Sequence, residues 1–165
     1  MLKGIPKILS PELLKVLCEM GHSDRIVIAD GNFPSESMGK DAIVIRCDGH
    51  GVPEILDAIL QVFPLDTYVE NPVNLMQLMP DDVGKVETPI WDTYKEIVKK
   101  HDDRGEAAIG KYLKRFAFYD EAKNSICDHC NRRICNLRKC NAAEGCCSRV
   151  EIYNCTDSGN IDFWI

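Results

Sequence analysis

Residues 20–34 read MGHSDRIVIADGNFP, and the rest of the chain is arranged around this stretch. The run from Arg25 to Ala29 is short and apolar, which predicts a buried strand. His22 comes just before this run and Asp30 comes just after it. Extended residues rise about 3.3 Å each, so a straight strand would hold His22 and Asp30 far apart. The two can share a site only if His22 turns back on a loop or if the site is built from several segments.

A histidine and a carboxylate flanking a strand suit an acid/base site for a small polar ligand. Imidazole side chains exchange protons near neutral pH, and ligand groups in open α/β sheets gather at strand ends. The simpler interpretation is a helix end, a strand and a turn, with a solvated histidine, and the spacing leaves both open. His50 and His101 are weaker acid/base candidates, because each lies in a polar stretch.

The composition limits the class of protein. A chain of 165 residues with 45% hydrophobic content is expected to form one domain with a substantial core. The net charge of −6 and the pI of about 5.2 argue against a nucleic acid or an anionic membrane as partner. We find no apolar signal segment and no apolar run near 18 residues, so we expect a cytoplasmic protein.

Hydrophobic periodicity and turn residues predict alternating helices and strands, which is typical of an α/β fold. Ser10 and Pro11 suit the start of the first helix, Gly21 suits its end, and Thr88 suits a helix cap before Pro89. The predicted helices cover 11–20, 53–63, 89–100, 106–112 and 116–122, and the predicted strands cover 25–29, 42–47 and 74–79.

Seven short motifs follow one another over residues 1–124. They are LKGIP (2–6), LSPELL (9–14), MGH (20–22), IAD (28–30), NFP (32–34), PLDTYV (64–69) and RFAFY (115–119). In content, order and spacing they resemble the RbsD/FucU family of sugar mutarotases, and they favour its fucose branch. The resemblance implies a three-layer αβα single domain with a central sheet. It also implies a homo-oligomer with the sugar site near subunit boundaries.

The resemblance implies that the chain interconverts the α and β anomers of L-fucose by acid/base catalysis, without a metal or other cofactor. It assigns His22 as the proton donor, and Asp30 and Asp66 as acceptors of hydrogen bonds from sugar hydroxyls. Tyr119 would contact the sugar with its ring and hydroxyl group. By sequence alone, Asp66 suits a local Asx turn equally well. The monosaccharide and further copies of the chain are the expected partners.

Three alternatives remain open. The first, within the same enzyme class, is a mutarotase of the D-ribose pyranase type. The second is a non-catalytic sugar-binding protein that has lost turnover through its altered C-terminus. The third is a zinc-binding regulatory module built on the thiols near Cys127 and Cys130.

The segment 125–165 differs in character from the rest of the chain, and we expect this tail to be poorly ordered. Seven of the nine cysteines lie in it, and Cys127 and Cys130 have the CxxC spacing of a zinc site. A secreted disulfide framework conflicts with the missing signal segment.

A third interpretation of the tail fits better. The codons allowed for residues 125–147, read one base later, permit AFAIIATGESATYGNVMLRKGV. This readout resembles the C-terminal strands and Tyr-Gly-Asn motif of the family. We therefore interpret the tail as a frame-shifted form of that segment, which would lack the family's Tyr and Asn and one strand of the sheet.

Overall fold

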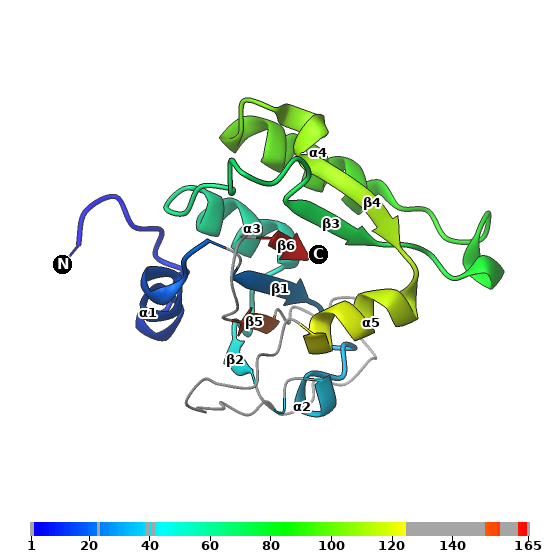
Figure 1. Ribbon diagram of the computed structural model, residues 1–165, viewed down its shortest axis with the longest axis horizontal. Coiled ribbons are helices and arrows are strands. Elements are labelled where there is room, and N and C mark those ends of the chain that lie inside the picture. Colours follow the sequence, from blue (N-terminus) through cyan, green and yellow to red (C-terminus); the bar gives the residue numbers. More distant parts are fainter. Residues whose placement is uncertain are drawn as a thin grey trace.

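The computed structural model describes residues 2–22, 24–38, 40, 42–124, 151–155 and 162–164. Within this part of the chain a six-stranded sheet forms the centre, and helices lie around it (Figure 1). The strand order is β2-β5-β1-β6-β3-β4. The elements are α1 (Pro11–Glu19), β1 (Arg25–Ala29), α2 (Ser35–Met38), β2 (Ile43–Arg46), α3 (Val52–Leu60), β3 (Val73–Met76), η1 (Pro80–Asp82), α4 (Pro89–His101), η2 (Gly105–Ala108), β4 (Ile109–Leu113), α5 (Arg115–Asn124), β5 (Glu151–Cys155) and β6 (Asp162–Trp164).

The sheet is mixed. β1 runs parallel to β6 and antiparallel to β5, and β5 also pairs antiparallel with β2. β3 runs parallel to both β6 and β4, so β4 lies at one edge of the sheet. Among the described residues, no helix is long and apolar enough to cross a membrane.

Two short pieces of the cysteine-rich tail, β5 and β6, belong to the same sheet as β1. These eight residues are therefore part of the sheet, and the expectation of a poorly ordered tail over 125–165 stays a prediction. The zinc and frame-shift interpretations rest on residues 125–147, which lie outside the described residues. The division of the chain at residue 124 stays a prediction.

Alternate side chains of β1 enter two different cores, which confirms the α/β class and gives the three layers. Ile26 and Ile28 pack into a large core with the buried faces of α1, α3 and α4. Val27 and Ala29 pack on the opposite face of the sheet, in a smaller core with Phe118 of α5. Successive side chains of a strand point to opposite faces, so a strand buried on both sides reads as a continuous apolar run.

The start of α1 is as predicted, but its end is not. Ser10 accepts a hydrogen bond from the Leu13 N–H at 3.1 Å, which caps the helix. The φ angle of Gly21 is not positive, so Gly21 does not adopt the left-handed conformation of a glycine cap. The helix ends instead because Met20 is extended, with φ −71° and ψ 139°. Thr88, the other predicted cap, makes no side-chain capping bond.

The helix predicted at 106–112 is wrong. A short 3-10 turn, η2, is followed there by β4, which pairs with β3 in parallel. Gly110 lies where the chain passes close to Asn71 and Asn74, so pairing with β3 decides the conformation of this segment. The other predicted elements are observed, with ends shifted by a few residues.

Candidate active site

His22 lies in the turn between α1 and β1, with 65% of its side chain exposed. Its Nδ1 atom is 3.1 Å from Oδ2 of Asp66. The Asp24 carboxylate accepts a hydrogen bond from the Gly21 N–H at 2.6 Å, and the Asp24 N–H donates to the Gly21 carbonyl at 3.2 Å. His22 therefore lies in a turn that two hydrogen bonds between Gly21 and Asp24 close, and one of its ring nitrogens contacts the Asp66 carboxylate.

The Asp66 side chain is fully buried, and its two oxygens have different tasks. Oδ1 accepts the Tyr68 N–H at 2.8 Å, which is the Asx turn considered from the sequence. Oδ2 faces Nδ1 of His22. The Asx turn is therefore observed, and the acceptance of hydrogen bonds from sugar hydroxyls by Asp66 stays a prediction. A buried carboxylate needs such partners, because burial of an unpaired charge is costly.

The contact with Asp66 determines what His22 can do chemically. When Nδ1 carries the hydrogen and donates it to Asp66, a neutral imidazole keeps the lone pair of Nε2 free to accept a proton. The ring of Tyr68 stands edge-on to the imidazole, with centroids 5.1 Å apart and an angle of 80° between the planes. Tyr68 is 80% exposed, so this pair forms an aromatic wall open to solvent. Such a wall suits the apolar face of a small polar molecule.

Asp30 and Tyr119, the other two predicted site residues, lie at the opposite end of β1. Asp30 is exposed, and its carboxylate accepts hydrogen bonds from the backbone and side-chain N–H groups of Asn32 at 2.9 Å and 3.3 Å. The half-buried Tyr119 packs edge-on against Phe33, with centroids 5.4 Å apart. Phe33 in turn donates its N–H to the Asp30 carbonyl at 3.1 Å, so Asp30 and Tyr119 share a neighbour.

The structure thus brings together His22 with Asp66, and Asp30 with Tyr119, as two separate groups. The five residues of β1 between them span about 17 Å. In Figure 1, α5 with Tyr119 lies beside the end of the β1 arrow, away from the strand's start.

The other histidines weighed from the sequence have different surroundings. His50 lies 3.3 Å from the exposed Glu54 carboxylate, one helical turn away. His101 lies 2.7 Å from Asp57 and joins α4 to α3, so its environment is that of a packing contact. Within the described part of the chain, no group of three or more His, Cys, Asp or Glu side chains is arranged to hold a metal ion.

Three residues near His22 were missed by sequence reasoning: Asp24, Tyr68 and Arg104. Tyr68 could have been found, because it stands two residues after Asp66, where an Asx turn places its N–H. Asp24 and Arg104 lie in polar stretches that resemble solvated loops, and only the folded chain shows what they contact.

Comparison with known proteins identifies the family of the chain. Residues 3–128 match the model of the RbsD / FucU transport protein family. The chain is 49% identical to a protein of Danio rerio named fucose mutarotase, over 76% of this chain and 80% of the relative. The crystal structure of FucU from Bifidobacterium longum is 52% identical, with a TM-score of 0.70, and the match covers 94% of this chain and 100% of that one.

A second solved structure is that of the fucose mutarotase of Streptococcus pneumoniae in complex with L-fucose. It is 41% identical, with a TM-score of 0.62, and the match covers 74% of this chain and 83% of that one. The chain therefore belongs to the RbsD/FucU family.

Proposed function

We propose that this protein is an L-fucose mutarotase, an isomerase that interconverts the α and β anomers of the sugar. The relatives named as fucose mutarotases support the substrate. The observation that carries the proposal for the chemistry is the contact between His22 Nδ1 and the buried carboxylate of Asp66. It leaves an exposed imidazole with a fixed orientation, which is what a proton-transfer catalyst requires.

In this mechanism His22 moves one proton between two sugar oxygens. Nε2 takes the proton of the anomeric hydroxyl, and the imidazolium returns a proton to the ring oxygen as the bond from C1 to that oxygen breaks. The aldehyde formed at C1 turns about the C1–C2 bond, and the reverse steps close the ring on the other face. While His22 holds the extra proton, the Asp66 carboxylate stabilises the positive charge on its imidazole ring. The reaction has no net change in protons or electrons.

We further propose that Asp30 and Tyr119 bind the sugar, and that a neighbouring copy of the chain supplies them. β1 separates these residues from His22, and Asp30 lies on the exposed surface. In a homo-oligomer, the His22 end of one copy can face the Asp30 end of the next, which completes the site with residues from two chains. The proposal includes the cytoplasmic location expected from the sequence.

Saturation-transfer NMR on L-fucose tests the activity directly. One anomeric proton signal is saturated, and the intensity of the other reports exchange between the anomers. We expect exchange well above that in buffer for the 165-residue chain. H22A should lose it by at least about a hundredfold, because general acid/base catalysis contributes that much. H50A is the matched control, since His50 is also an imidazole beside a carboxylate, and it should keep full activity.

The possible outcomes separate the proposal from its alternatives. Fucose binding without exchange by a folded chain would overturn it in favour of a sugar-binding protein. Faster exchange with D-ribose than with L-fucose would favour the pyranase type. Equal activity of H22A and the unmodified chain would remove His22 from the mechanism.

A further inference from the structure

Arg104 makes two sets of hydrogen bonds with different parts of the chain. Its Nε and Nη2 atoms donate to the two carboxylate oxygens of Asp102, at 2.9 Å and 2.8 Å. Its Nη1 atom donates to the backbone carbonyls of Asp66 and Val69, at 3.0 Å and 2.6 Å. One planar group therefore joins the segment after α4 to the loop after α3.

The loop between Asp66 and Val69 carries both neighbours of His22. Asp66 supplies the carboxylate at Nδ1, and Tyr68 supplies the ring that stands edge-on to the imidazole. The two carbonyls that accept from Arg104 are the first and last of this four-residue loop. Any displacement of the loop would move the carboxylate and the aromatic wall together.

We propose that Arg104 is a positioning residue for His22: by holding the loop at both ends, it fixes Asp66 and Tyr68 against the imidazole. The role rests on the proposed function of His22 in proton transfer. Arg104 does not touch the sugar in this proposal. It acts through the loop, and Asp102 acts through Arg104 by fixing the plane of the guanidinium group.

The chemistry of arginine explains why this residue type is needed. A guanidinium group offers five N–H donors in a rigid fork, so it can bind a carboxylate with one edge and two carbonyls with the remaining nitrogen. A lysine has one nitrogen on a flexible stem and cannot hold both sets. Asp102 is largely buried, with 13% of its side chain exposed, so its pairing with Arg104 is shielded from water.

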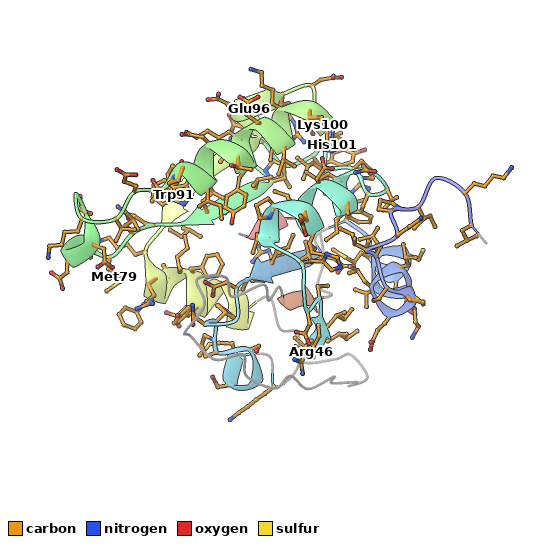
Figure 2. All side chains as sticks on the ribbon, turned by 180° about the vertical axis from the view of Figure 1, so that it is seen from behind. Arg46, Met79, Trp91, Glu96, Lys100 and His101 are labelled. Carbon is orange, nitrogen blue, oxygen red and sulfur yellow. The ribbon has the colours of Figure 1, made fainter. Side chains whose placement is uncertain are left out.

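The test compares R104M with a matched variant, R46M. Arg46 also binds the aspartate two residues away, Asp48, and its side chain is 23% exposed against 27% for Arg104. Figure 2 shows Arg46 at the opposite side of the molecule from His101. His101 is the last residue of α4 and comes shortly before Arg104 in the chain. Each variant therefore removes an arginine–aspartate pair, one beside the His22 loop and one away from it, with the aspartate 13% exposed in the first pair and 56% exposed in the second.

We expect R104M to lower kcat for anomer exchange by about tenfold to a hundredfold with KM changed less than about twofold, because misplacement of a catalytic group by about 1 Å has effects of this size. R46M should leave kcat unchanged. R104K should recover only part of the loss. D102N should reproduce the loss, and the double variant should show less than the product of the two effects, since both act through one contact.

A direct reading of the His22 ring separates this proposal from the proposed function. The ¹⁵N shifts of neutral His22 report which ring nitrogen carries the hydrogen. We expect the share of Nδ1–H to fall in R104M and to stay unchanged in R46M, whether or not the chain turns over fucose. An unchanged share in a folded R104M or D102N would overturn the positioning role. If the unmodified chain shows no anomer exchange, only the proposed function is overturned. If R104M does not fold, D102N, which keeps the shape of the side chain, decides the matter.

Discussion

The carboxylate of Asp24 accepts a hydrogen bond from the backbone N–H of Gly21 at 2.6 Å, and this bond closes the turn on which His22 stands. Asp24 is 6% exposed, and its burial raises the pKa of the carboxyl group, with the Gly21 hydrogen bond opposing the rise. The turn is thus held by the buried carboxylate of Asp24, which directly precedes the first residue of β1.

Replacement of Asp24 separates the hydrogen bond from the charge. D24A should lower the free energy of unfolding by about 1–2 kcal/mol, because it leaves the Gly21 N–H without its buried acceptor. D24N keeps an acceptor oxygen and removes the buried charge, so it should be at least as stable as D24A and closer to the unmodified chain. Urea denaturation at neutral pH measures both. Equal loss in the two variants would show that the charge, and not the bond, holds the turn.

Mixing two inactive variants tests whether the site is shared between chains. H22A and D30N should each be inactive alone. After dissociation and reassembly at equal amounts, about a quarter of the sites would combine an intact His22 with an intact Asp30 from another copy, and exchange should return to about that level. A site contained in one chain gives no recovery. A control mixes the double variant H22A/D30N with the unmodified chain. Its activity reports how completely the subunits redistribute between oligomers.

The lowered pKa of Asp57 predicts that the folded state loses stability in acid. Hydrogen bonds from Lys100, and then from His101, lower the pKa of its carboxyl group from 3.8 to about 2. Figure 2 shows Lys100 and His101 together at the end of α4. The folded state therefore gains stability from ionised Asp57 above pH 3.8 and loses it as the pH falls through about 2.

The D57N variant measures this contribution. It should be less stable than the unmodified chain by about 1 kcal/mol at neutral pH, and the difference should shrink between pH 4 and pH 2. D92N is the matched control, because Asp92 pairs with Lys95 at 2.9 Å but is 78% exposed. Exposed pairs contribute little, so D92N should show no such difference. Urea denaturation across this range would contradict the assignment if the D57N gap stayed constant.

The strand at the centre of the fold could be predicted because its sequence leaves few choices. A run of four apolar residues between a helix end and a turn has to be buried on both faces, and Ile26 to Ala29 of β1 are. The segment 106–112 has no such pattern. Its conformation depends on β3, which is more than thirty residues away in the chain, and local propensity could not show that partner.

The site could be predicted only in part, for the same reason. Motifs identified His22 and Asp66, and the fold joins them across 44 residues of sequence. The spacing predicted that a straight strand would hold Asp30 far from His22, but the motifs did not show that Tyr119 shares a neighbour with Asp30 at that end of β1. They also did not identify Arg104, because its contacts are with backbone carbonyls, which any residue at positions 66 and 69 would offer.

Gly110 is the position where pairing of β4 with β3 can be tested. A Cβ atom there would lie 2.8 Å from Oδ1 of Asn74 and 3.0 Å from Cβ of Asn71, so both neighbours would have to move. G110A should lower the free energy of unfolding by about 1–3 kcal/mol, as overpacking of a close contact does. G21A is the control, because a Cβ at Gly21 meets nothing within 4 Å and its φ is not positive. Urea denaturation should therefore show little change for G21A. A loss in G21A as large as that in G110A would mean that Gly21 does serve as a left-handed helix end.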